Sequence, residues 1–304
     1  MESFWRSLPG TILLVAIIAV LTATGALGIQ VHRATHPPRE ADDTGDLGAL
    51  LSHVEEVHFR SADGIELSGW LVRGAPGGAP VVLCHDLGAG KGSLVNLAIA
   101  LQQAGFTALA LDFRAHGKSG GEASTLGVDE KRDVLGALDY LAALKNVDAR
   151  RIGLYGVGLG AHAAVLAAAD RPAARVVVLD GLYPDPGYPL VRKVYAGWSF
   201  GVRYLGLFPR LAFRLMSRPE GGTQEAAAVV PLLASRDLLF VAPAGDATLA
   251  AEMQRMYASV PEQRDADANL IVLPATRTSH LYGEELDRYN RRITEFFEKR
   301  LARR

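Results

Sequence analysis

Short apolar runs and longer amphipathic stretches follow one another along most of this chain. The first two runs flank the turn Ala62-Asp63-Gly64, which predicts a hairpin. The predicted strands are Val54–Phe59, Ile65–Val72, Val81–Cys84, Thr107–Phe113, Arg151–Tyr155, Arg175–Leu179, Leu238–Val241 and Leu270–Leu273. The predicted helices are Leu94–Ala104, Glu130–Leu144, Ala161–Asp170, Ala247–Tyr257 and Glu284–Arg304. This order predicts an α/β fold, with a mostly parallel sheet and helices on both faces.

A long apolar segment near the N-terminus predicts a membrane-spanning helix. Thr11–Val31 carries no charge and, at about 1.5 Å per residue, can cross a hydrocarbon layer of about 30 Å. A cleaved secretory signal is the alternative, because Ala26-Leu27-Gly28 offers a small-residue site. We expect a single-pass membrane protein. Its orientation stays open, because Arg6 on one side faces Arg33 and Arg39 on the other.

Composition bounds the class of protein. With 304 residues, of which 49% are hydrophobic, the chain can bury a large core, and its net charge of −1 gives no reason to expect a nucleic acid partner. A single cysteine, Cys84, excludes an intramolecular disulfide. We expect an anchor over residues 1–35, a linker over 36–50 and a folded domain over 51–304.

The pentapeptide Gly156-Val157-Gly158-Leu159-Gly160 has the form of the G-x-S-x-G turn that carries a nucleophilic serine, but glycine stands at the serine position. A predicted strand precedes it and a predicted helix follows. Glycine adopts the strained backbone of such a turn at little steric cost. The turn can therefore form although the nucleophile is missing.

Three further stretches extend this likeness from about Val54 to the C-terminus. The hairpin from Ser61 to Trp70, the turn from Leu111 to Gly120, which is similar to D-x-R-G-H-G-x-S-x-G, and the stretch from Thr125 to Gly153 occur in the order found in one family. The chain resembles the α/β-hydrolase family, in its serine-aminopeptidase and esterase-like branch, and in particular bacterial, membrane-anchored members. The resemblance implies the α/β-hydrolase fold.

The resemblance also implies a set of catalytic positions. With Gly158 in place of the serine, Asp246 takes the place of the acid and His280 that of the base, in the chain order of the family. For Asp246, the N-cap of a helix beginning at Ala247 is an equally good interpretation. Three further histidines have weaker claims: His85 and His116, in turns that the family uses structurally, and His162, on the helix that follows the elbow.

The expected oxyanion hole consists of two backbone N–H groups, those of Leu87 and Leu159. Asp86 stands in the first of these loops, where relatives carry glycine. A carboxylate pointing inward would oppose the negative charge that develops during catalysis. The alternative is that Asp86 turns to solvent or caps the following turn.

A long insertion, 181–236, lies where the family carries a lid. Its basic and aromatic residues suit either a surface resting on membrane headgroups or a plain cap over the pocket. These residues are Arg192, Lys193, Arg203, Arg210, Arg214, Arg218, Tyr188, Tyr195, Trp198, Phe200, Tyr204, Phe208 and Phe213.

The main hypothesis is a catalytically impaired hydrolase relative that binds a small apolar ligand or a partner at the membrane. The alternative is an ester or amide hydrolase that uses His280, Asp246 and a non-standard nucleophile or a water. A third hypothesis is dinucleotide binding, from Gly156-x-Gly158-x-x-Ala161 with Asp180 as the ribose-binding acid. Under the first two hypotheses we expect no cofactor and no metal.

Overall fold

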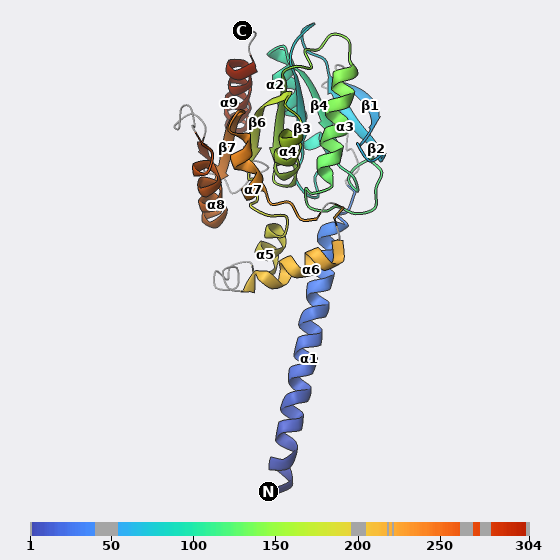
Figure 1. Cartoon of the computed structure of the whole chain (residues 1–304), viewed down its shortest axis with the longest axis vertical. Coiled ribbons are helices and arrows are strands. Elements are labelled where there is room, and N and C mark those ends of the chain that lie inside the picture. The colour runs from blue at the N-terminus through green and yellow to red at the C-terminus, as the bar shows by residue number, and fades with distance from the viewer. Residues whose placement is uncertain are drawn as a thin grey trace.

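The computed structural model describes residues 2–39, 54–195, 205–217, 219–220, 222–261, 270–273 and 281–301, with side chains from residue 11 onward. Eight strands of the described residues form one sheet in the order β1-β2-β4-β3-β5-β6-β7-β8 (Figure 1). The pairs β1/β2 and β2/β4 are antiparallel and the other neighbours are parallel. The strands are β1 Val54–Arg60, β2 Glu66–Val72, β3 Pro80–Cys84, β4 Thr107–Leu111, β5 Ile152–Val157, β6 Ala174–Asp180, β7 Asp237–Pro243 and β8 Leu270–Leu273.

Helices cover both faces of this sheet. The buried side chains of α2 and α9 pack on one face, and those of α3, α4 and α8 pack on the other. The helices are α1 Glu2–Thr35, η2 Lys91–Leu94, α2 Val95–Gln103, α3 Glu130–Ala143, α4 Leu159–Asp170, α5 Tyr188–Val194, α6 Leu207–Ser217, α7 Ala226–Val229, η4 Val230–Leu233, α8 Ala247–Ala258 and α9 Glu284–Leu301. The predicted mostly parallel sheet between two helical layers is confirmed.

The predicted boundaries around the pentapeptide were wrong by two residues on each side. β5 runs on to Val157 and α4 begins at Leu159, so Gly158 alone connects them. Hydrophobic periodicity does not detect a one-residue turn, because apolar residues continue from the strand into the helix.

The register of the central strands brings two loops together. In the parallel pair β3 and β5, Cys84 lies opposite Gly156, so the two strands end at the same level. The loop after β3 and the turn after β5 therefore lie side by side at the carboxyl edge of the sheet, where open α/β sheets bind ligands.

α1 is one continuous helix whose last turns pack on the domain (Figure 1). Val31 and Ala34 are buried against Leu126, Leu190 of α5 and Phe213 of α6. From residue 11 to its end, α1 is long and apolar enough to cross a membrane. The predicted linker and the start of the predicted domain lie largely outside the described residues, which omit 40–53.

The segment between β6 and β7 contains α5, α6, α7 and η4, at the place of the predicted lid. Within it, α6 packs against both α1 and α5. Five residues of the predicted basic and aromatic set lie outside the described part of the chain: Trp198, Phe200, Arg203, Tyr204 and Arg218.

Candidate functional site

The turn between β5 and α4 has the backbone form of a nucleophile elbow. Gly158 has φ +52° and ψ −108°, a combination of backbone angles that residues other than glycine rarely adopt. A Cβ on Gly156 would lie 2.4 Å from the Gly160 carbonyl oxygen, and one on Gly160 would lie 2.3 Å from that of Cys84. The flanking glycines are thus required by close packing of the backbone, and the apex carries no side chain.

Two backbone N–H groups beside this turn point at one oxygen atom. Oδ1 of Asp86 accepts hydrogen bonds from the N–H of Leu87 at 2.8 Å and from that of Leu159 at 3.0 Å. These are the two donors expected to form the oxyanion hole, and the structure brings them together. Their acceptor is a carboxylate of the chain itself. The inward orientation of Asp86 is therefore the one observed.

The Asp86 carboxylate also fills the space of the missing nucleophile. A Cβ built on Gly158 would lie 2.0 Å from Asp86 Oδ1 and 2.5 Å from its Cγ, far inside van der Waals contact. Two independent features thus favour glycine at position 158: the positive φ, which strains any other residue, and the neighbouring carboxylate, which leaves no space for a Cβ. A serine could stand here only if Asp86 moved or were replaced.

Two buried histidines hold the loop that carries Asp86. His85 contacts the Asp86 carbonyl oxygen through Nδ1 at 2.7 Å, and its Nε2 accepts from the N–H of Phe113 at 3.1 Å. Burial, followed by the charge of His116, lowers the pKa of His85 to about 3, so His85 is neutral. Nε2 of His116 accepts from the N–H of Gly88 at 3.2 Å. The structural role predicted for both histidines is confirmed.

The turn from Asp112 to Gly120 serves the fold. Asp112 and Lys91 form a fully buried ion pair of 2.6 Å, and Asp112 also accepts from the Lys91 N–H at 2.8 Å. Burial raises the pKa of Asp112, but the hydrogen bonds and the charge of Lys91 outweigh burial, and the pKa is lowered. Ser119 donates to the Asp112 carbonyl oxygen at 2.6 Å and accepts from the N–H of Ser68 at 2.9 Å. The burial of Lys91 was not predicted from the sequence, because a lysine near a glycine-rich loop is normally exposed.

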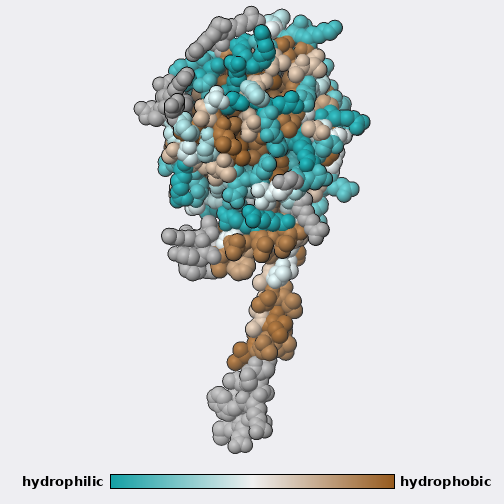
Figure 2. Space-filling view, in the orientation of Figure 1, coloured by the Kyte–Doolittle hydropathy of each residue, from teal (hydrophilic) through white to brown (hydrophobic). Residues whose placement is uncertain are grey.

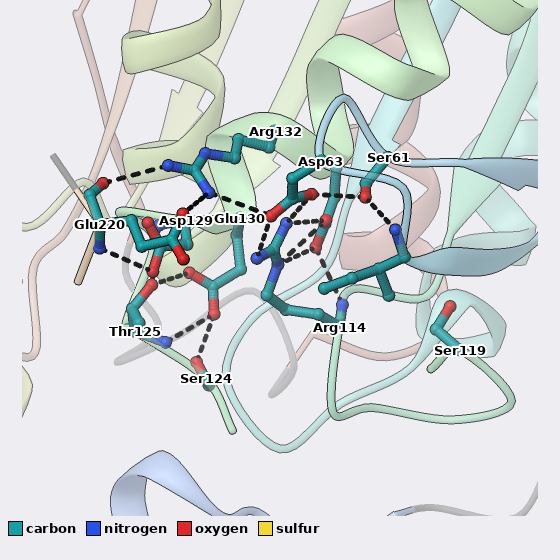
Figure 3. A network of polar contacts seen from close by, with 12 residues as sticks. Ser61, Asp63, Arg114, Ser119, Ser124, Thr125, Asp129, Glu130, Arg132 and Glu220 are labelled. Carbon is teal, nitrogen blue, oxygen red and sulfur yellow. Dashed lines mark hydrogen bonds and ion pairs between the residues drawn. The ribbon is translucent and has the colours of Figure 1, made fainter. Parts of the chain in front are cut away.

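The arginine of the same turn is the centre of a polar network (Figure 3). Arg114 contacts the buried Asp133 of α3 through its N–H, Nε and Nη2, at 2.7–3.1 Å, and Asp63 of the β1–β2 turn at 2.9 and 3.0 Å. Arg132 joins Asp63 to Glu220 of the insertion, at 3.1 and 2.6 Å. The network connects the hairpin, the turn, α3 and the insertion, and contains no group that contacts Gly158.

The predicted acid has two structural partners. Oδ1 of Asp246 accepts from the N–H of Leu249 at 3.1 Å, which confirms the N-cap of α8, and Oδ2 forms an ion pair of 3.0 Å with Arg192 of α5. The predicted base, His280, lies outside the described residues. The sequence hypothesis of an Asp246–His280 pair therefore stays a prediction.

Other candidates from the sequence have structural contacts. The buried Asp180 accepts from the hydroxyl of Tyr289 of α9 at 2.7 Å, so a ribose would have to displace this contact. Nε2 of the buried His162 contacts the Gln224 carbonyl oxygen at 3.0 Å. Among the residues that the structure describes, no group of three or more His, Cys, Asp or Glu side chains could hold a metal ion.

Comparison with known proteins places this geometry in context. Residues 81–304 match the sequence profile of the Alpha/beta hydrolase family. An uncharacterised protein of Mycobacterium tuberculosis is 33% identical over 178 residues, which cover 57% of this chain and 60% of the relative. A thiohydrolase of Eupenicillium brefeldianum is 31% identical over 147 residues, covering 46% and 47%. The chain thus spans at most about three fifths of these relatives.

Solved structures show the same fold. An esterase of Pyrococcus furiosus superposes with a TM-score of 0.66 at 21% identity, over 88% of this chain and all of the esterase chain. The α/β hydrolase GrgF of a Penicillium species gives a TM-score of 0.64 at 18% identity, over 82% and 99%.

Proposed function

Because the chain belongs to the α/β-hydrolase family, we propose that it is a catalytically impaired member whose inherited site binds a small apolar ligand or a partner at the membrane. One observation carries this proposal: Oδ1 of Asp86 accepts the two oxyanion-hole hydrogen bonds beside an elbow that has no side chain. The side chain that would attack a substrate is thus absent, and the two N–H groups that would stabilise its oxyanion are already occupied.

Each defect alone would slow hydrolysis strongly. Loss of the nucleophile lowers kcat of a serine hydrolase by about 10⁶, and the activity that remains depends on the oxyanion hole and on binding. Here a carboxylate takes the place of the substrate oxygen. Hydrogen bonds to a charged group contribute about 1.5–3 kcal/mol each, so a neutral carbonyl oxygen competes poorly for these two donors.

The carboxylate also changes which ligand the site favours. An open oxyanion hole donates hydrogen bonds to an ester or thioester carbonyl, whereas a carboxylate accepts them. We therefore expect an apolar ligand with a hydroxyl or amine group near Asp86, in preference to an ester.

Attachment to the membrane is the second part of the proposal. α1 has the length and composition of a spanning helix, and Val31 and Ala34 in its last turns are buried in a small apolar cluster with Leu126, Leu190 and Phe213. A cleaved signal passes the same test of composition. Immunoblotting of the expressed protein with tags at both ends decides between them, because only an uncleaved anchor keeps both tags in the membrane fraction.

Hydrolysis of p-nitrophenyl butyrate by the full chain in detergent micelles tests whether the site is closed, that is, without a nucleophile and with Asp86 on the oxyanion-hole donors. Four proteins are compared: wild type, Gly158→Ser, Asp86→Gly and the double variant Asp86→Gly/Gly158→Ser. We expect only the double variant to gain activity, by about 10²-fold or more, a small part of what a nucleophile contributes. Adding His280→Ala to the double variant should remove the gain.

Two results would contradict the proposal. Turnover by the wild type that does not depend on Asp86 would mean that the site is open. No gain in a folded double variant would mean that the remaining hydrolase machinery is not assembled around Gly158.

The position of Asp86 favours a second candidate function, in which Asp86 itself is the nucleophile. Its carboxylate lies where a serine side chain would begin, and Oδ1 is held by both amides. The other carboxylate oxygen would attack the acyl carbon, and the alcohol would leave with a proton from His280. Water would then attack Cγ of Asp86 in the resulting anhydride, which releases the carboxylic acid and regenerates the Asp86 carboxylate. Single turnover with excess protein in H₂¹⁸O would place ¹⁸O in the peptide containing Asp86, and Asp86→Asn would be inactive. Neither result is expected of a closed site.

A further inference from the structure

The outward side of α6 is apolar. Leu207, Phe208, Leu211 and Leu215 are 70%, 58%, 48% and 64% exposed, and their spacing places them on one side of the helix. The flanking Met216 is exposed too. Apart from α1, most of the exposed large apolar side chains of the described residues lie on this one helix. A surface helix of a globular protein normally turns polar side chains outward.

The inward side of α6 is already used. Pro209 and Phe213 are buried, and Phe213 belongs to the cluster that includes Val31 and Ala34 of α1. The two arginines are paired with acids of the insertion: Arg210 with Asp185 at 2.9 Å and Arg214 with Glu225 at 3.5 Å. These contacts fix the orientation of α6 about its own axis. Its apolar residues therefore face outward because of how the helix is packed.

The outward side of α6 continues the exposed apolar surface of α1. In Figure 1, α6 crosses α1 just below the domain, and in Figure 2 the brown surface of α6 lies directly above the brown surface of α1, with a short pale stretch between them. Side chains 11–26 of α1 are exposed, and full burial begins at Val31. From Thr11 to Gln30 the helix rises by about 30 Å, which matches the hydrocarbon thickness of a bilayer. α6 thus lies at the level where such a span would leave the membrane.

We propose that the apolar side of α6 lies in the interface of the lipid bilayer that α1 crosses, so that the protein has a second, flat membrane contact. The inference rests on the proposed membrane attachment of α1 and does not depend on the state of the catalytic site. An amphipathic helix in this position inserts its apolar side about 5–10 Å into the boundary between headgroups and acyl chains. The site beside Gly158 is then held at a fixed height above the membrane, because Leu87 packs against the same cluster as α1 and α6.

Labelling at single cysteines tests this contact in the full chain reconstituted into phosphatidylcholine and phosphatidylglycerol vesicles. The native Cys84 is buried, and burial raises the pKa of its thiol, so it does not compete for the label. An environment-sensitive nitrobenzoxadiazole label is placed at Leu211→Cys, at Val15→Cys of α1, and at Arg150→Cys, which precedes β5 at the opposite end of the strands.

Acyl-chain nitroxide lipids and aqueous iodide then report the surroundings of each label. We expect lipid quenching and blue-shifted emission at positions 211 and 15, and iodide quenching at position 150. Iodide quenching at 211 with lipid quenching at 15 overturns this inference alone. Iodide quenching at 15 overturns membrane attachment itself. Protection of 211 from both quenchers means that protein covers α6, and also overturns the inference.

Discussion

The Asp112–Gly120 turn and the Gly158 elbow both contact the loop after β3, but they use their polar groups differently. In the turn, the two buried charged side chains form ion pairs with other elements of the fold: Asp112 with Lys91 and Arg114 with Asp133. At the elbow, two backbone donors converge on Asp86, a residue of the loop itself. Family motifs therefore carry two kinds of information. The turn motif reports how the chain folds, and only the elbow and its loop report whether it can perform chemistry.

The largest effect on stability is expected at the turn, from Lys91→Met. This substitution leaves Asp112 buried without its partner, which lowers the free energy of unfolding by about 3–5 kcal/mol at pH 7. Urea denaturation of the full chain in micelles measures the loss. Arg150→Met, which removes an exposed ion pair with Asp148, is the control and should change little.

The pH dependence of the same pair of proteins has a defined sign. Because Lys91 lowers the pKa of folded Asp112, the wild-type pair stabilises the fold above the unfolded pKa, and this stability is lost as the pH falls through the folded pKa. Lys91→Met removes the side-chain hydrogen bond and the charge of Lys91, so burial is opposed mainly by the backbone N–H groups of residues 91 and 118, and the pKa of Asp112 rises relative to the wild type. The difference between the two proteins should therefore shrink on acidification from pH 7 to pH 4. A constant difference would show that Asp112 does not titrate as described.

At the elbow, Gly158→Ser should destabilise the protein by about 1–3 kcal/mol, because the new Cβ meets the Asp86 carboxylate and the backbone has positive φ. Adding Asp86→Gly should recover part of this loss, giving a coupling free energy of about 0.5–3 kcal/mol in a double-mutant cycle. Strict additivity of the two changes would mean that Asp86 leaves the site readily and that the comparison with the turn is wrong.

The smallest effect is expected at Asp246. Asp246→Ala removes the N-cap of α8 and should lower the free energy of unfolding by about 1 kcal/mol, whereas Asp246→Asn keeps a capping side chain and should lose a few tenths. Equal losses in the two variants would assign the effect to the Arg192 ion pair. In the Asp86→Gly/Gly158→Ser background, a fall in ester hydrolysis with Asp246→Asn would support the predicted role of Asp246 as the carboxylate that orients the catalytic histidine.

The sequence predicted the elements whose signals are local. The core strands and the elbow at Gly158 follow from short runs and a known turn, and the two amides of Leu87 and Leu159 follow from the resemblance to the family. The direction of Asp86 does not, because it depends on space left empty by a residue 72 positions away in the printed sequence. The partners of Asp112 and Arg114 were also missed, because Lys91 and Asp133 lie on other elements of the fold and no local pattern connects them. α6 was missed although its apolar and basic residues follow a clear helical period, because the prediction for the insertion used only its composition.

The contact between Asp86 and position 158 has a consequence for how such a chain can change over generations. Serine alone at position 158 collides with the carboxylate, and glycine alone at position 86 leaves no nucleophile, so neither single substitution yields a protein that selection for hydrolysis could favour. Restoring a serine at position 158 together with free oxyanion-hole amides therefore requires two coordinated changes, whereas positions outside this contact can change one at a time.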